Sequence, residues 1–251
     1  MNKSFWLSGA LFLFSVSSAW AQPGALYLGM LMDVPVAKTL PAGGIETVLR
    51  MYPNGGLLTS LMVGIADRFS LGVSYGGENI IGTGKANMNP QPCVHVKYLV
   101  MEERFLSPAL LIGFNSQGYG AYSKETDRYR MKSRGLYAVV SKNTSFLGGL
   151  GIHAGINYSL ETKDGDSDPN LFAGCHKFIN SDLVILCEYD TAVNDNSDNA
   201  IGSGKGYLNA GVRWSFEQRL FLEFAWKNIL ENGDKIPGSS REVKLVYMTY
   251  F

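Results

Sequence analysis

The feature that most constrains the fold of this chain is its last segment, residues 243–251, in which two faces alternate strictly. One face of an extended strand would carry Val243, Leu245, Tyr247, Thr249 and Phe251, and the other face Lys244, Val246, Met248 and Tyr250. A strand that crosses a bilayer needs about nine to eleven residues, with one face toward lipid and the other toward the inside of a barrel. The segment therefore predicts a membrane-spanning strand.

A C-terminal strand that ends on Phe is typical of the clients of the bacterial outer-membrane assembly machinery. We interpret Tyr247, Thr249 and Phe251 as the assembly signal. The partners that we expect are therefore this machinery and the lipid of the outer membrane.

The first 21 residues have the three parts of a secretory signal peptide. Lys3 supplies a positive charge, residues 5–16 form an apolar stretch, and Ala19 and Ala21 are the small residues before a cleavage site. The apolar stretch is too short for a membrane helix, which needs about twenty residues. The sequence predicts cleavage before Gln22 and an outer-membrane location for the remaining chain.

Alternating segments recur along the whole chain. In residues 69–76, 150–160, 208–216 and 220–227, large apolar side chains alternate with small or polar ones. Weaker alternation begins near Ile45, Leu57, Val94, Pro108, Leu136, Leu171 and Leu183. With the last segment the count is about twelve, an even number, as in single-chain outer-membrane barrels. The sequence predicts an all-β, closed antiparallel transmembrane β-barrel over residues 45–251, with a soluble β-sandwich as the alternative fold.

The connections between these segments alternate in length, as short periplasmic turns and long external loops do in such barrels. Short turns are expected at residues 67–68, 102–104, 143–145, 180–182 and 217–218, and long polar loops at 77–91, 116–133, 161–169, 191–205 and 228–241. Aromatic residues gather near both ends of the strands, as at the two interfaces of a membrane. They are Phe69, Phe105, Phe216 and Phe251 at the short-turn end, and Tyr75, Phe114, Tyr158, Tyr189 and Trp226 at the long-loop end.

Charged and polar side chains fall on the face of the strands opposite the apolar face. We expect the following residues to line the lumen: Glu46, Arg50, His95, Lys97, His153, Asn157, His176, Glu188, Asp190, Asn209, Arg213, Glu223, Lys227 and Lys244. Such a lumen is either a hydrated path for polar solutes or an ion-paired, filled interior, because buried charges are costly unless paired. Many lumen positions hold Gly or Ser, which favours the path. We predict a passive pore or export conduit, with a closed structural or surface-interaction barrel as the alternative.

Two other classes of function find little support in the sequence. The chain has 22 basic and 22 acidic residues and thus a formal net charge of zero, which gives no reason to expect nucleic acid as a partner. A hydrolase needs a Ser or Cys held by a His. No local motif joins a Ser to His95, His153 or His176, and these point inward, whereas the nucleophile of the outer-membrane phospholipase faces lipid. We expect no enzymatic activity, with lipid hydrolysis as the least favoured alternative.

One acidic loop raises the question of a metal. Asp164, Asp166 and Asp168 occupy every second position, as oxygen ligands of Ca²⁺ often do. An EF-hand would require Gly at Pro169 and Glu at Cys175, so that motif is excluded. The alternatives are a solvated acidic loop and a loose Ca²⁺ site, and no other cofactor is expected.

The three cysteines leave at least one without a disulfide partner. Cys175 and Cys187 flank the turn near Ser181 symmetrically, so they would face each other across a hairpin. We interpret them as small lipid-facing residues, with a disulfide as the alternative, and Cys93 has no evident partner.

Residues 32–44, Met-Asp-Val-Pro-Val-Ala-Lys-Thr-Leu-Pro-Ala-Gly-Gly, precede the first expected strand. The Pro-x-Ala stretch followed by Gly resembles the corresponding segment of outer-membrane barrels of the YjbH type. This resemblance implies a link with exopolysaccharide production and secretion, and hence a polysaccharide cargo. By composition alone, residues 22–44 form a Pro- and Gly-rich lead that is either periplasmic or a small plug inside the lumen.

Overall fold

The computed structural model describes residues 28–145, 149–197, 200–233 and 238–251. The expected signal peptide, residues 1–21, lies outside the described residues. No helix in the described ranges is both long and apolar enough to span a membrane.

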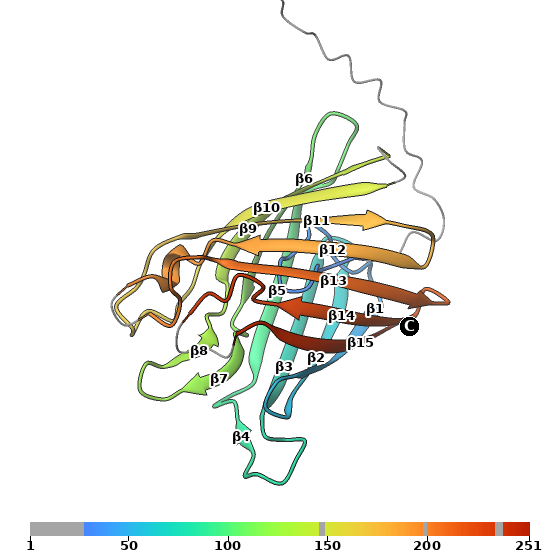
Figure 1. The fold of residues 1–251 in the computed structure, drawn as a ribbon. Helices are drawn as coiled ribbons and strands as arrows, with labels where there is room; N and C mark the ends of the chain where they lie inside the picture. Colours follow the sequence, from blue (N-terminus) through green and yellow to red (C-terminus); the bar gives the residue numbers. More distant parts are fainter. Residues whose placement is uncertain (1–27, 146–148, 198–199, 234–237) are drawn as a thin grey trace, which may run out of the picture.

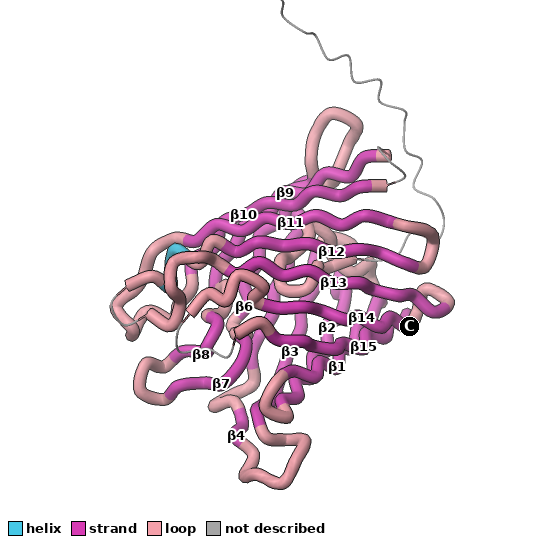
Figure 2. The backbone as a smooth tube through the Cα atoms, viewed as in Figure 1, coloured by secondary structure: helices cyan, strands magenta, loops and turns pink. Residues whose placement is uncertain are grey.

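The wall of the molecule is one antiparallel sheet that closes on itself (Figures 1 and 2). The sheet has thirteen strands, and because β4 (Asn87–Met88) is a two-residue addition beside β3, twelve strands form the barrel. These are β1 (Gly44–Tyr52), β2 (Gly56–Ala66), β3 (Phe69–Glu78), β5 (Cys93–Met101), β6 (Ala109–Asn115), β9 (Gly135–Thr144), β10 (Leu150–Tyr158), β11 (Asn170–Phe178), β12 (Leu183–Asp190), β13 (Tyr207–Phe216), β14 (Leu220–Lys227) and β15 (Ser240–Tyr250). The predicted closed barrel of twelve strands is confirmed.

The seam between the first and last strands completes the barrel. β1 pairs with β15 from Gly44 opposite Tyr250 to Met51 opposite Val243, so neither strand has a free edge. The backbone nitrogen of Phe251, which directly follows β15, donates to the carbonyl of Gly43 at 3.2 Å. Closure matters because unpaired backbone groups are costly in lipid.

The side chains alternate between an apolar outer surface and an inner surface, as the sequence predicts. On the outer surface many large apolar side chains are exposed, among them Leu71, Val73, Ile112, Val140, Ile152, Ile156, Ile185, Val212, Trp214 and Phe224. A belt of this size is unusual on a soluble protein and is normal for a wall that faces lipid. The aromatic residues predicted at the two ends also lie on this surface, with Tyr75 and Trp226 about half exposed.

The two ends of the barrel differ in the length of their connections. The turn end carries tight connections such as residues 67–68, and the loop end carries long ones that include the hairpin of β7 (Tyr119–Ser123) and β8 (Arg128–Met131) and the short 3-10 helix η1 (Val193–Asp195) (Figure 1). This hairpin was expected to be loop. Two connections depart from the predicted lengths: residues 53–55 form a tight connection at the loop end, and residues 102–108 form a longer one at the turn end.

Residues 28–40 lie inside the barrel, apart from the exposed Lys38, and Pro41 and Ala42 are exposed where the chain reaches β1; we call residues 28–43 the luminal segment. Leu31, Met32, Val34 and Leu40 have no exposed surface, and they belong to the same apolar cluster as inward-facing wall residues such as Leu111. The segment contains one isolated bridge, between Met30 and Pro35, and no described strand of the wall pairs with it. Side chains of the wall therefore hold its buried part in place, while Gly43, at its end, is bound to the backbone of Gly64 at 2.9 Å.

Candidate functional site

The Glu188 carboxylate, on β12, is the main anchor of the luminal segment. It accepts hydrogen bonds from three successive backbone N–H groups, those of Met32 at 3.1 Å, Asp33 at 2.8 Å and Val34 at 2.9 Å. The Lys227 ammonium lies 3.3 Å from the same carboxylate. A buried carboxylate is tolerated when donors surround it, so the backbone of the segment and Lys227 together satisfy Glu188.

Asp33 is a charged side chain of the segment that reaches the wall. Its carboxylate forms salt bridges with Arg50 at 2.8 Å and with Lys227, and all three side chains are buried. Arg50 in turn donates from Nε to Glu242 at 2.7 Å. If one partner of a buried ion pair is removed, the other charge remains buried without a counter-charge, at a high cost in free energy. Asp33 is therefore a strong point of attachment.

Four cations of the wall bind carbonyl oxygens of the segment instead of side chains. Lys97 donates to Gly29 at 2.7 Å, Arg213 to Leu31 at 2.8 Å, Lys244 to Met32 at 2.5 Å and Arg134 to Asp33 at 3.0 Å. Because every residue has a backbone carbonyl, these contacts depend on the path of the segment and not on its side chains.

Glycines on the inner surface make room for the segment. A Cβ atom added at Gly174 would lie 2.4 Å from Cδ1 of Leu31, and one added at Gly211 would lie 2.9 Å from Sδ of Met32. Both distances are too short for real Cβ contacts, so the glycines allow these apolar side chains to pack against the wall.

Inner-surface serines have a matching role. The Ser141 hydroxyl accepts the backbone N–H of Ala37 at 2.8 Å, and the Ser70 hydroxyl accepts that of Leu40 at 3.0 Å. The Gly and Ser content of the lumen, which we took as a sign of an open path, therefore reflects in part the space and the acceptors that the luminal segment uses.

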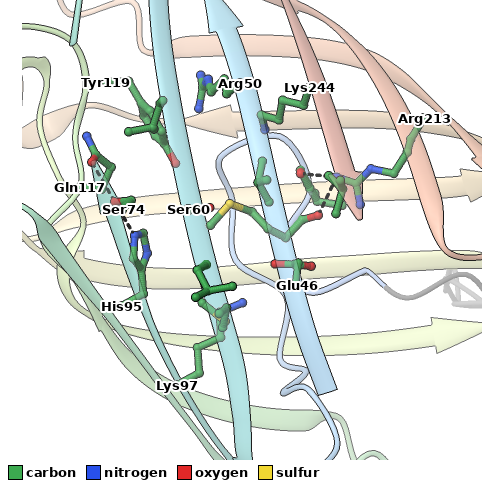
Figure 3. Close-up of a pocket in the computed structure, with 17 residues that line it drawn as sticks. Glu46, Arg50, Ser60, Ser74, His95, Lys97, Gln117, Tyr119, Arg213 and Lys244 are labelled. Atoms are coloured by element: carbon green, nitrogen blue, oxygen red, sulfur yellow. Dashed lines mark hydrogen bonds between the residues drawn. The ribbon is translucent and has the colours of Figure 1, made fainter. Parts of the chain in front are cut away.

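A cavity of about 80 Å³ remains beside the segment, on the side of the lumen formed by β1 to β5 (Figure 3). Glu46, Arg50, His95, Lys97 and Tyr119 are among the residues that line it, together with Ser60, Ser74, Gln117, Arg213 and Lys244. This volume has room for a few water molecules. The cavity is therefore small, and its lining combines these charged and polar groups with apolar side chains such as Val48, Leu58 and Met62.

Two histidines and a serine form a chain of hydrogen bonds in the lumen that the sequence did not suggest. Nδ1 of His153 lies 2.8 Å from the Ser141 hydroxyl, and Nε2 of His153 lies 2.9 Å from Nδ1 of His176. All three side chains are buried, and the hydroxyl also binds Ala37. A serine nucleophile must reach its substrate. Because the luminal segment covers Ser141, this arrangement is a structural network in the described state.

The fourteen residues predicted to line the lumen all lie on the inward side of their strands. Eleven are buried, namely Arg50, Lys97, His153, Asn157, His176, Glu188, Asn209, Arg213, Glu223, Lys227 and Lys244, and three are half-buried, namely Glu46, His95 and Asp190. The residues interpreted as the assembly signal point outward: Tyr247 and Phe251 are exposed and Thr249 is half-buried.

Three charged residues of this network were missed by sequence reasoning. Glu242 shares the inward parity of Lys244, so extending the alternation of the last strand by one step would have found it. Arg134 comes directly before β9 and donates to Asp190 at 3.0 Å. Asp33 lies in a stretch without periodicity, so no alternating pattern predicts which way its side chain points.

Two of the three aspartates in the acidic loop are engaged by other protein groups. Asp164 pairs with Arg128 at 2.5 Å and with Lys132 at 2.8 Å, and Asp166 accepts backbone hydrogen bonds from a neighbouring loop. Asp168 is exposed. Within the described residues no group of three or more His, Cys, Asp or Glu side chains is arranged to hold a metal ion. Asp164 and Asp166 therefore join loops to one another, whereas Asp168 is exposed, as expected for a solvated loop.

The cysteines lie as the sequence suggested. Cys175 and Cys187 are directly opposite each other on β11 and β12, with no disulfide between them. Cys93 is also free, and its sulfur lies 3.3 Å from the Tyr129 hydroxyl.

Comparison with known proteins agrees with this geometry at the level of the fold. No family model matches the sequence, and neither does any curated protein. The solved KdgM porin is similar over 83% of this chain and 99% of its own, with a TM-score of 0.51 and 11% identity. KdgM in complex with disordered oligogalacturonate covers the same shares, with a TM-score of 0.50 and 10% identity, and the NanC porin reaches 0.47 at 10% identity over 82% of this chain and 99% of its own. The chain therefore has the barrel fold of outer-membrane porins.

Proposed function

We propose that this protein is a passive, non-enzymatic channel for small polar solutes in the bacterial outer membrane. The observation that carries the proposal is the inner surface, where charged and polar side chains from β1 round to β15 surround the lumen. A lumen of this kind would be hydrated wherever protein does not fill it, and its mixed charges would pass polar solutes without a strong preference for one sign.

Within this proposal the luminal segment is a plug that must move before solutes pass. It is held by hydrogen bonds and salt bridges to Glu188, Arg50 and Lys227, without strand pairing to the described wall. Departure of residues 28–42 would leave the seam between β1 and β15 unchanged, because that seam runs from Gly44 to Met51 and is extended only by Gly43. We therefore assign residues 28–43, the described part of the predicted lead, to a plug, and we place the start of the barrel at Gly44, one residue before the predicted start.

The proposed location rests on the two ends of the sequence and on the apolar belt. The leader at residues 1–21 would direct export and be removed before Gln22, and the last strand would be read by the assembly machinery. Deleting Phe251 tests the second step. We expect less protein to reach the outer membrane of cells, while the purified chain still folds into detergent micelles, because Phe251 follows the last strand and is 86% exposed.

Single-channel recording of the purified protein in planar bilayers tests the function. A channel with a movable plug should show stepwise currents separated by long closed periods. Silence in several preparations, and also after the plug contacts are weakened, would favour the alternative of a closed barrel that acts through its external loops.

Polysaccharide export is a second candidate, and the resemblance of residues 32–44 to YjbH-type barrels supports it. Ten of those residues, 32 to 41, contribute most of the buried contacts of the luminal segment, so a moving chain would have to displace the part of the sequence that carries the resemblance. Oligogalacturonate and a neutral oligosaccharide of equal length, added to an open channel, would separate the two candidates. Transient block of the current by a saccharide supports a polysaccharide conduit, and unaltered current supports a channel for small solutes.

A further inference from the structure

A second cavity, about 300 Å³ in volume, lies at the loop end under the hairpin of β7 and β8. Its lining comes from the residues before β5, from the ends of β6 and β10, and from the hairpin itself. Small-molecule sites begin at about this volume. The cavity takes no part in the proposed passage through the lumen.

The described lining of this cavity contains acidic and aromatic residues and no basic residue. Two carboxylates, Asp127 and Glu161, and three aromatic residues, Phe114, Tyr122 and Tyr129, line the cavity, Phe114 from the outward side of β6. None of the lining residues in the described part of the chain is Lys, Arg or His. Carboxylates and ring faces both attract positive charge, and neither has a cation within the lining.

Glu161 is the carboxylate with the least compensation. Its oxygens accept the backbone N–H groups of Tyr129 at 2.9 Å and Ser133 at 3.0 Å, which fix their direction. No Lys, Arg or His among the described residues forms a salt bridge with it, and the nearby Arg128 is already paired with two aspartates. Burial raises the pKa of Glu161, as expected for a carboxyl group that lacks a counter-charge.

The other groups complete the site. The rings of Tyr122 and Tyr129 meet edge to face with their centroids 5.0 Å apart, so the two rings present different faces to the space around them. Asp127 is bound by the Tyr122 hydroxyl and, on the exposed side, by Lys163 at 2.6 Å. Asp127 is thus partly neutralised at the rim, whereas Glu161 lies deeper.

We propose that this cavity binds a small organic cation, with a quaternary or protonated amine seated between the Glu161 carboxylate and the aromatic rings. A positive group would supply the missing counter-charge for Glu161. Rings arranged around an ammonium group are a recurrent way of binding it, with carboxylates adding attraction. The proposal goes beyond the proposed channel function and does not depend on it.

Calorimetric titration of the detergent-solubilised barrel tests the proposal with a matched pair of probes. One probe is choline, and the other is the neutral alcohol in which a quaternary carbon replaces the nitrogen. The two have nearly the same shape, so their difference reports the charge. We expect choline to bind at least about tenfold more tightly, an affinity ratio typical of a desolvated cation–π and carboxylate site. Equal affinity of the two probes would show a merely apolar pocket and overturn the proposal, as would the absence of choline binding at about 10 mM.

Variants place the binding in this cavity. E161Q keeps one acceptor for the backbone and removes the charge, and it should weaken choline binding about tenfold. F114L removes one ring at similar volume, in a strand of the barrel wall, and should weaken binding severalfold without a change in folding. E125Q is the matched control, since Glu125 is exposed in the same hairpin and does not line the cavity. Binding that survives both E161Q and F114L would overturn the assignment.

Discussion

The backbone nitrogen of Asp33 lies 2.8 Å from Oε2 of Glu188, which is 155 residues further along the chain. Through this contact a segment without regular structure is joined to the middle of the wall. The carboxylate accepts two further N–H groups beside it, so the contact is part of a small cradle of donors. The first prediction tests what this contact does for the luminal segment.

Replacing Glu188 with Gln should loosen the luminal segment. Oε2 of Glu188 accepts the N–H groups of Met32, Asp33 and Val34, and Oε1 is bound by Asn209 and Lys227. An amide has one acceptor oxygen, so its NH2 group must face the donors on one of these two sides. Each buried donor left without an acceptor costs about 1–3 kcal/mol. We expect the fraction of time in the conducting state to rise at least about tenfold in single-channel recordings, since about 1.4 kcal/mol corresponds to a factor of ten.

Glu46→Gln is the control for this experiment. Glu46 is a lumen carboxylate at the cavity beside the segment, and within the described chain it makes no hydrogen bond to residues 28–43. It removes the same charge from the lumen without touching the cradle. An equal rise in both variants would mean that lumen charge, and not the cradle, controls conduction.

Replacing Gly174 with Ala should push Leu31 away from the wall, because the new Cβ atom would lie 2.4 Å from Cδ1 of Leu31. Overpacking of this kind costs about 1–3 kcal/mol. The luminal segment should then become accessible to a protease added to the purified protein. Truncating the partner as well, in the double variant G174A/L31A, should restore part of the protection. Protection that is unchanged in G174A would contradict the described packing.

Replacing Arg128 with Gln should disorder the loops that meet at the loop end. The Arg128 guanidinium lies 2.5 Å from Asp164 and 2.7 Å from Asp195, which belong to different loops, and all three side chains are buried. Removing one partner of a buried ion pair costs about 3–5 kcal/mol. Hydrogen exchange should quicken in residues 159–169 and 191–197 while the strands keep their protection. Arg130→Gln, a half-buried neighbour on the same strand, should leave both loops protected.

The same cluster should depend on pH. Burial raises the pKa of Asp164. Hydrogen bonds from Lys132 and from the backbone of Asp166, together with the charges of Lys132 and Arg128, lower the pKa by more than burial raises it, so the net pKa lies below the ordinary 3.8. A carboxyl group whose pKa is lower in the folded state stabilises that state above its unfolded pKa, and this contribution is lost as the pH falls through the folded pKa.

We therefore expect the NMR signals of residues 161–168 to keep their positions from neutral pH to about pH 4 and to shift toward those of a disordered loop below it. D164N should abolish this transition. D168N, which changes an exposed carboxylate of the same loop, should leave it in place. A transition that persists in D164N would assign it to another group.

Replacing Val212 with Arg should destabilise the barrel in lipid. Val212 lies in the middle of β13 on the outer surface and is 39% exposed. An Arg that faces lipid near the middle of the bilayer costs about 2–4 kcal/mol. The free energy of unfolding, measured by urea titration in lipid vesicles, should fall by this amount. Leu230→Arg, at an exposed loop residue, should change it by less than about 0.5 kcal/mol.

The sequence by itself determined the barrel and the face that each strand residue occupies. A strand has a side-chain period of two, so the alternation in residues 150–160 or 243–250 reports directly which residues share a face. All twelve alternating segments correspond to strands of the wall. The prediction missed the hairpin of β7 and β8 because its strands are only five and four residues long. Tyr129 and Met131 alternate with Arg128 and Arg130, but over too few residues to establish a period.

Only the tertiary structure decided what fills the lumen. Glu188, Lys97 and Arg213 bind backbone groups of the luminal segment, and a backbone N–H or carbonyl carries no mark in the sequence of the partner that it will meet. The same holds for Gly174, whose missing side chain has meaning only once Leu31 lies against it. Alternation is a local property that each strand records by itself, whereas the occupancy of the lumen depends on contacts between residues far apart in the sequence, 68 positions for Gly29 and Lys97 and 182 for Leu31 and Arg213.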